Sequence, residues 1–304
     1  VLRSDLASYL ATTDRALAAR PGVELPACRI VVGIAGKGGV PDLLWQARFF
    51  NEREVEAQLA KTRYRLHYFH DKRFWQLFDL ETGHGVQIMQ AADGAPIWDA
   101  GSPLRNIMQW QLARYGRVLL HAGTLATSGR GVLLAGAGGS GKSGTVLSGV
   151  LAGLQTVGDD YVCVSRDDLT ARPLFETLKQ DVAGLSRLGL MGHPAIPSTT
   201  NWQDKYQFYL RDLGVPAIDH IVLGALLLPA VTGDHETRLL PASSKEAFLA
   251  LAPSGVSQIP GDRPVLYAAA ADVARRLPCY HLRLGSDPAN VVRSIKQFIQ
   301  GELG

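Results

Sequence analysis

The sequence predicts an α/β protein in which a smaller, mainly β domain over residues 1–100 precedes an α/β domain over residues 101–304. Three observations lead to this expectation. The first hundred residues carry short strand-like runs rich in aromatic side chains. The rest of the chain alternates apolar runs with helical patterns, and near its centre a glycine-rich loop joins an apolar strand to a helix.

The composition excludes several classes of protein. Hydrophobic residues make up 46% and charged residues 19% of the 304 residues, which is typical of a folded globular chain. A formal net charge of +3 gives no support to nucleic-acid binding or to electrostatic attachment to a membrane. No apolar run is long enough for a membrane span, and residues 1–20 lack the pattern of a signal peptide. The three cysteines lie far apart, so we expect a reducing, cytoplasmic location.

The N-terminal domain is expected to begin with an amphipathic helix within residues 1–20, followed by a strand over 30–34. The glycines at 36–39 resemble the start of a phosphate-binding loop, but they continue into Pro41 and Asp42, so we interpret them as a plain turn. Strands over 63–69 and 73–80 are predicted to form a hairpin with its turn at 70–72. A further strand is expected over 86–89.

The second domain is expected to open with a helix over 104–115, since Pro103 suits the start of a helix and Gly116 its end. Buried strands are predicted over 118–120, 132–135, 161–164 and 221–228 and around Val157. Further helices are predicted over 143–154, 244–251, 268–276 and 288–300.

The segment from Gly136 to Ser143 matches the pattern GxxxxGK[ST] of phosphate-binding loops. Glycines let consecutive backbone N–H groups point at one phosphate, and the following helix adds its N-terminal dipole. Lys142 would contact the β- and γ-phosphates and Ser143 would give an oxygen to Mg²⁺. The predicted nucleotide-binding residues are Gly136, Ala137, Gly138, Gly139, Ser140, Gly141, Lys142, Ser143 and Gly144.

Asp159 and Asp160 stand at the edge of an apolar strand shortly after this loop. Phosphoryl transfer needs one carboxylate to hold magnesium, and a second can take the proton of an alcohol acceptor. Either acid fits either role on the residues alone; the metal ligands we predict are Ser143 and Asp160. We interpret the other pair, Asp167 and Asp168, as solvated acids of a hairpin tip.

The stretch from His121 to Gly144, followed by Val157 to Asp160, resembles the catalytic domain of HPr kinase/phosphorylase and its relatives. The resemblance implies a fold related to the nucleotide domain of phosphoenolpyruvate carboxykinase, and assembly into an oligomer. It also implies that Asp159 or Asp160 is the catalytic base towards a serine hydroxyl and that His121 lies near the active site. The sequence departs from enzymes acting on HPr at Gly144, where those usually have an acid, so HPr is not the expected acceptor.

The predicted function is that of an ATP- and Mg²⁺-dependent kinase with an alcohol-group acceptor: a serine of a small protein or peptide, or a small metabolite. Catalytic roles are predicted for Asp159, Asp160, Lys142 and His121. Lys179, Arg187 and Arg211 are candidates to clamp the transferring phosphate. Two alternatives remain open: a nucleotide-binding regulator that hydrolyses NTP to change conformation, and a protein that binds nucleotide without catalysis. The acceptor, and the choice of ATP over another phosphoryl donor, are left open as well.

Overall fold

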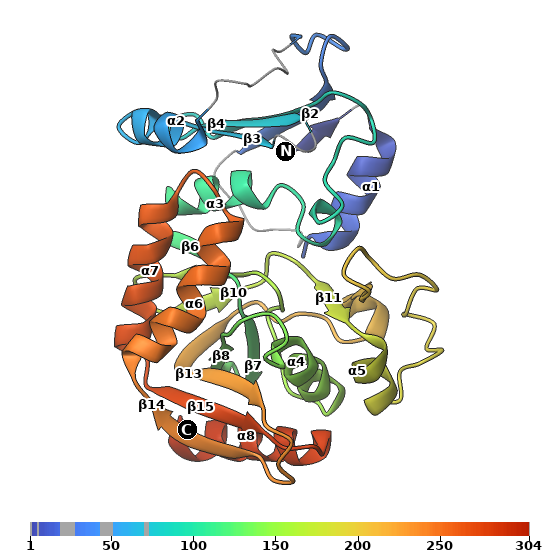
Figure 1. Cartoon of the computed structure of the whole chain (residues 1–304), viewed down its shortest axis with the longest axis vertical. Helices are drawn as coiled ribbons and strands as arrows, with labels where there is room; N and C mark the ends of the chain where they lie inside the picture. Colours follow the sequence, from blue (N-terminus) through green and yellow to red (C-terminus); the bar gives the residue numbers. More distant parts are fainter. Residues whose placement is uncertain (1, 5, 19–27, 43–50, 70–72, 304) are drawn as a thin grey trace. The chain divides into compact units, whose positions relative to one another are not determined.

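The computed structural model describes residues 2–4, 6–18, 28–42, 51–69 and 73–303, and the chain divides into two units. Unit 1 comprises Val1–Tyr115 together with Ile259–Arg263, and unit 2 comprises Gly116–Gln258 and Pro264–Gly304. Both units combine helices with a β-sheet (Figure 1), so the mixed α/β class predicted from the sequence is confirmed. The turn predicted at 70–72 lies outside the described residues.

Unit 1 is built on one five-stranded sheet in the order β1-β2-β5-β4-β3. Strands β1, β2 and β5 run parallel, whereas β4 is antiparallel to both of its neighbours. Its elements are β1 (Leu2–Ser4), α1 (Ala7–Ala16), β2 (Arg29–Ile34), α2 (Glu52–Leu59), β3 (Tyr64–Phe69), β4 (Phe74–Asp79), β5 (His84–Met89), the 3₁₀ turn η1 (Asp99–Gly101) and α3 (Arg105–Ala113). The predicted glycine turn after β2 is present, closed by a hydrogen bond from the Gly36 N–H to the Val40 carbonyl.

The boundary between the units lies at Tyr115/Gly116 and not after residue 100, because helix α3 packs within unit 1. Its Ile107 and Trp110 are fully buried in one cluster with Phe74 and Phe78 of β4. The short segment 259–263 also joins unit 1, where Gly261 packs against Trp110. Sequence patterns could not show either feature, since each depends on which apolar surface a segment meets after folding.

A chain of buried polar groups crosses unit 1 and ends at Asp99. The Tyr9 hydroxyl donates to Oδ2 of Asp99 at 2.7 Å, and Nε2 of Gln87 donates to that hydroxyl at 3.0 Å. The Leu104 N–H donates to Oδ1 of Asp99 at 3.2 Å and so links this carboxylate to the start of α3. Burial raises the pKa of Asp99 to about 6. The hydrogen bond from Tyr9 lowers this pKa, but its effect is smaller than that of burial.

We expect Asp99 to make the stability of the protein depend on pH. An acid whose pKa is higher in the folded state stabilises the fold below its unfolded pKa of 3.8, and that contribution is lost as the pH rises through about 6. The wild type should therefore lose on the order of 3 kcal/mol relative to Asp99→Asn between pH 4 and pH 7. Urea unfolding of both proteins across this range measures the difference. Asp14→Asn, at an exposed position of α1, is the control, and parallel profiles for wild type and Asp99→Asn would contradict the expectation.

Unit 2 contains an eight-stranded mixed sheet, with β13 paired to β8, β10 and β15. Its strands are β6 (Arg117–Leu120), β7 (Gly123–Thr127), β8 (Arg130–Leu134), β9 (Val162–Ser165), β10 (Thr170–Arg172), β13 (Ile221–Val231), β14 (Arg238–Ala242) and β15 (Cys279–Leu284). A separate ribbon pairs β11 (Thr177–Gln180) with β12 (Tyr206–Tyr209). The remaining elements are α4 (Lys142–Leu151), α5 (Val182–Arg187), the 3₁₀ turn η2 (Leu210–Leu213), α6 (Ser244–Gln258), α7 (Arg263–Arg276) and α8 (Pro288–Glu302).

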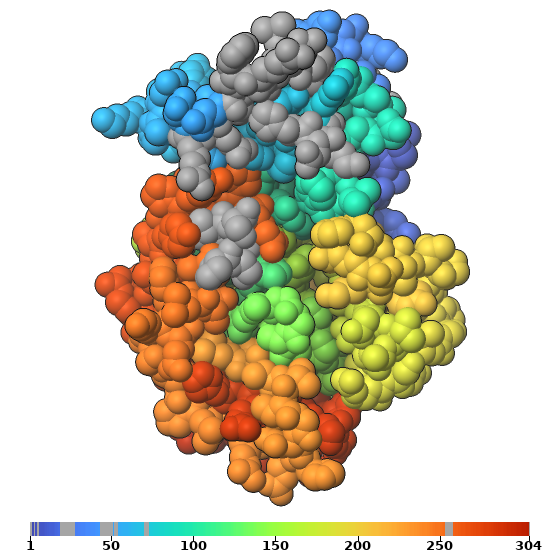
Figure 2. All heavy atoms as spheres, in the orientation of Figure 1, coloured from blue at the N-terminus to red at the C-terminus, as the bar shows by residue number. Residues whose placement is uncertain are grey.

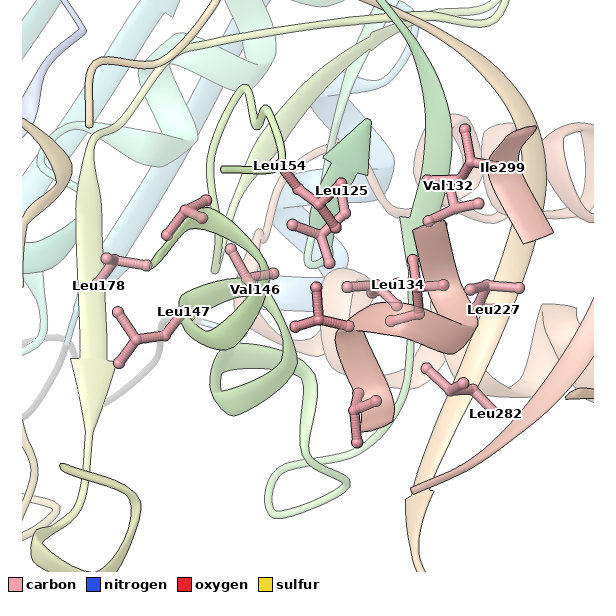
Figure 3. Packing of buried hydrophobic residues seen from close by; sticks show 14 of the residues in the cluster. Leu125, Val132, Leu134, Val146, Leu147, Leu154, Leu178, Leu227, Leu282 and Ile299 are labelled. Atoms are coloured by element: carbon pink, nitrogen blue, oxygen red, sulfur yellow. The ribbon is translucent and has the colours of Figure 1, made fainter. Parts of the chain in front are cut away.

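Helices α4 and α8 pack on β7 and β8, while α6 contacts β13 and β6 on the other face of the sheet (Figure 1). Figure 3 shows part of the core around α4 and α8: Val146 of α4 points towards Leu125 of β7 and Leu147 towards Leu178 of β11, while Leu134 of β8 and Leu227 of β13 lie towards α8. Strands β8, β13 and β15 are parallel, so their carboxyl ends lie at one edge of the sheet. In α/β sheets this edge is where ligands bind. Among the described residues no helix is both long and apolar enough to cross a membrane.

Candidate functional site

The glycine-rich loop lies between the end of β8 at Leu134 and the start of α4 at Lys142, at the carboxyl edge of the parallel strands. Gly141 is the N-cap of α4 with φ +102°, and a Cβ built there would lie 2.3 Å from Cδ1 of Leu284 at the end of β15. Both the backbone conformation and the space therefore require glycine. No side chain caps this end of α4, so its first N–H groups can receive an anion.

Lys142 is buried and its ammonium group folds onto the loop. Its Nζ donates to the carbonyl of Gly136 at 2.6 Å and to that of Ala137 at 3.2 Å. Burial lowers the pKa of Lys142, while the negative charges of Asp159 and Asp160 oppose that shift. The lysine thus places a positive charge at the loop, on the side that faces the two acids.

Asp159 is 1% exposed, and among the described residues its carboxylate oxygens have no partner in good hydrogen-bond geometry, although the Ser143 hydroxyl and the Asp160 N–H both act on it. Burial raises its pKa, and the neighbouring Ser143 side chain and the charge of Lys142 act against this rise. Gly123, at the start of β7, leaves room for this carboxylate, because a Cβ there would lie 2.8 Å from Oδ1 of Asp159. An unsatisfied buried carboxylate beside a serine hydroxyl is an arrangement that a bound cation would stabilise.

Asp160, in contrast to Asp159, has a hydrogen-bond partner at each carboxylate oxygen and is kept ionised. Its Oδ1 lies 3.1 Å from Nε2 of His121, and its Oδ2 accepts from Nζ of Lys179 on β11 at 2.7 Å. Burial alone would raise its pKa, but the charge of Lys179 and the hydrogen bond from His121 hold the pKa of Asp160 well below its usual range. Asp160 also has φ +66°, a conformation that is costly for a non-glycine residue and that is found at functional sites.

His121 follows β6, and its ring lies 5.3 Å from that of Tyr161. Because Asp160 is ionised, Nε2 of His121 carries the proton of their hydrogen bond. Nδ1 of His121 is buried without a hydrogen-bond partner in the described part of the chain. The histidine therefore orients and stabilises the Asp160 carboxylate.

The structure thus gathers the predicted residues Lys142, Ser143, Asp159, Asp160 and His121 into one region of unit 2. Figure 2 shows the green segment that includes the loop at the surface of this unit, beside the yellow-green and gold chain that follows the acids.

The three residues that the sequence suggested as phosphate clamps lie in different surroundings. Lys179 contacts Asp160, whereas Arg211 forms an ion pair with Glu176 at 2.5 Å between Nε and Oε2. Arg187 lies exposed on α5. Sequence reasoning missed Gly123, since only the fold shows that Asp159 needs the space of its absent side chain.

Substituting Gly123 by alanine is expected to disturb the site through a single methyl group. That methyl would lie 2.6 Å from Cγ2 of Val146 and 2.8 Å from Oδ1 of Asp159, so the carboxylate must move. We expect the free energy of unfolding to fall by about 1–3 kcal/mol. Urea unfolding measures this effect.

Gly144→Ala is the matched control for this substitution. A Cβ at Gly144 would lie 3.6 Å from Nε2 of Gln180, an ordinary contact, and alanine favours the helix. This variant should gain about 0.5–1 kcal/mol of stability. If Gly123→Ala behaved like Gly144→Ala, the steric argument for Gly123 would be wrong.

Comparisons with known proteins give a distant likeness to solved structures. No family model and no curated protein matches the chain. Among solved structures, the chain is similar to an Hpr(Ser) kinase/phosphatase from Coxiella burnetii, with 12% identity and a TM-score of 0.32. The match covers 61% of this chain and 99% of that one.

Proposed function

We propose that the chain is an ATP- and Mg²⁺-dependent phosphotransferase that moves the γ-phosphoryl group to a hydroxyl group. The acceptor would be a serine of a small protein or peptide, or a small metabolite. The observation that carries this proposal is the acid pair. Asp159 and Asp160 are adjacent in sequence, yet the first is buried beside the Ser143 hydroxyl with no partner in good hydrogen-bond geometry among the described residues, and the second is held anionic by His121 and Lys179. Two acids kept in different states suit a divided catalytic task.

The loop and the start of α4 supply the phosphate site of this proposal. Backbone N–H groups at an uncapped helix N-terminus attract an anion, and the glycines allow the close approach of the backbone. The ammonium group of Lys142 needs only to turn away from the Gly136 and Ala137 carbonyls to reach phosphate oxygens. These features fit the polyphosphate of a nucleotide.

The residues present also fit Mg²⁺, and they favour Asp159 as the carboxylate that holds it. Both oxygens of Asp159 lack a partner in good hydrogen-bond geometry among the described residues and Ser143 is its neighbour, whereas both oxygens of Asp160 are engaged. We therefore assign the metal to Ser143 and Asp159, in place of the Ser143 and Asp160 expected from the sequence. No group of three or more His, Cys, Asp or Glu side chains in the described residues could hold a metal ion, which suits Mg²⁺ shared with phosphates. Bound there, Mg²⁺ would neutralise charge on the phosphates.

Asp160 is then the acid that faces the acceptor. Each carboxylate oxygen has a second lone pair, so Asp160 can accept a hydrogen bond from the incoming hydroxyl while it keeps His121 and Lys179. Its low pKa makes it a weak base, which suits a reaction in which the hydroxyl proton leaves only as the bond to phosphorus forms. Its main task is to orient the nucleophile.

The proposal is tested by following the fate of γ-labelled ATP with Mg²⁺. Purified protein is incubated with serine-containing peptides, with small alcohols, and without any acceptor. We expect the label to appear as a phosphate ester on an acceptor, with only slow release of inorganic phosphate in the control. Brisk, steady hydrolysis without labelled acceptor would overturn the kinase assignment and favour an NTPase.

A further inference from the structure

The ribbon of β11 and β12 brings a third lysine, Lys205, towards the phosphate loop. Lys205 immediately precedes β12, whose first residue Tyr206 pairs with Gln180 of β11. Nε2 of Gln180 would lie 3.6 Å from a Cβ at Gly144 in α4. The start of β12 is therefore anchored beside the strand that touches the first turn of the loop helix.

The backbone of Lys205 is fixed by a tight turn. Its N–H donates to Oδ1 of Asn201 at 3.2 Å, and its carbonyl accepts from the Asn201 N–H at 2.7 Å. The Gln203 N–H also donates to Oδ1 of Asn201, and Asp204 takes a left-handed conformation with φ +56°. The side chain of Lys205 is half-buried, and it extends from a backbone that this turn fixes.

Three lysines lie on the loop or on the ribbon of β11 and β12 with its adjoining turn, and they differ in their partners. Lys142 donates to loop carbonyls and Lys179 to Asp160, whereas the ammonium of Lys205 has no hydrogen bond or ion pair to the described residues. Continued by two residues, the register that pairs Lys179 with Gln207 puts Lys205 on the face of the ribbon that carries Lys179, whose ammonium contacts Asp160.

We infer that Lys205 binds the γ-phosphoryl group. The inference rests on the proposed function and adds a catalytic residue to it. The γ-phosphate is the group assigned to Lys205 because the same ribbon carries Lys179, which holds Asp160, the acid facing the acceptor. The transferring group must lie between the loop and that acid.

In the reaction, the bond from γ-phosphorus to the bridging oxygen breaks and its electron pair stays on ADP. The bond from γ-phosphorus to the acceptor oxygen forms, and the hydroxyl proton passes to Asp160. Lys205 neither gains nor loses a proton; its positive charge stabilises the oxygens of the group in transit.

Calorimetry with Mg²⁺ tests this role without an acceptor, by comparing the affinities for ADP and for the imido analogue of ATP, which retains the γ-phosphate. Lys205→Ala and Lys205→Gln should weaken analogue binding about tenfold and leave ADP binding unchanged. Lys205→Arg keeps the charge and should restore most of the affinity. Lys296→Ala, at an exposed position on α8, is the control and should change neither affinity.

Each other outcome has a definite reading. An equal loss of affinity for ADP and the analogue would place Lys205 at another phosphate and overturn the inference. Unchanged analogue binding by Lys205→Ala and Lys205→Gln, with a wild type that binds both ligands, would overturn the inference and leave the proposed function standing. A wild type that binds neither ligand would overturn both.

Discussion

Asp160→Asn should slow phosphoryl transfer by about a thousandfold. The carboxylate that we propose orients the acceptor hydroxyl becomes an amide without charge, and one of its two ends can no longer accept a hydrogen bond. Affinity for Mg²⁺–ADP should stay near the wild-type value, since Ser143 and Asp159 remain. The measurement is transfer of label from γ-labelled ATP to a hydroxyl acceptor, or to water as the slow universal acceptor.

A loss of folding must be separated from a loss of chemistry in this variant. The substitution leaves the partly buried ammonium of Lys179 without its counter-charge, so we expect a lower free energy of unfolding. Adding Lys179→Met should recover stability and leave transfer slow. Asp167→Asn, at the exposed tip between β9 and β10, is the control that changes an acid outside the site. Full transfer by a folded Asp160→Asn protein would remove Asp160 from the mechanism.

Lys142→Met should have opposite effects on binding and stability. Affinity for Mg²⁺–ADP is expected to fall about a hundredfold, because charge-assisted hydrogen bonds to phosphate are lost. Stability should be maintained or increased, because the lowered pKa of Lys142 means that the fold disfavours its buried charge and methionine fills similar space. Calorimetry and urea unfolding measure the two quantities on the same samples.

Lys245→Met, at an exposed position in the first turn of α6, is the matched control for Lys142→Met. It should leave ADP affinity unchanged. If Lys142→Met bound Mg²⁺–ADP as tightly as the wild type, the phosphate site would not be at the glycine-rich loop. If it lost binding only together with its folded structure, the expected separation of binding from stability would be wrong.

The local part of the fold was predictable from the sequence. The strand, loop and helix around Gly136–Ser143 are contiguous in sequence. The backbone conformations of the loop and the apolar spacing of the strand and helix therefore depend on neighbouring residues, which a sequence pattern can detect. Helices α6 and α7 were predicted in the right places but too short, because their further turns, up to Gln258 in α6 and from Arg263 in α7, carry weak apolar periodicity. Strands β1, β7, β10, β11, β12, β14 and β15 were missed, because each is at most six residues long and lacks a long apolar run. The strand predicted around Val157 does not form, since the chain bends there.

The acid pair shows the same limit at the site. The spacing of the acid pair from the loop indicated its importance, but spacing does not distinguish one acid from the other. The sequence analysis assigned the metal to Asp160, and we now propose Asp159. What separates them is their surroundings. Asp160 meets His121 and Lys179, which are 39 and 19 residues away, and Asp159 fits beside Gly123 with no partner in good hydrogen-bond geometry in the described residues.

By itself the sequence determined that this chain has a mixed α/β fold and a glycine-rich loop, because both follow from local periodicity and backbone conformation. The tertiary structure alone decided that α3 belongs to unit 1 and that Asp160 is the paired acid. The physical reason is that burial, charge pairing and the space left by a glycine depend on contacts between residues far apart in the chain.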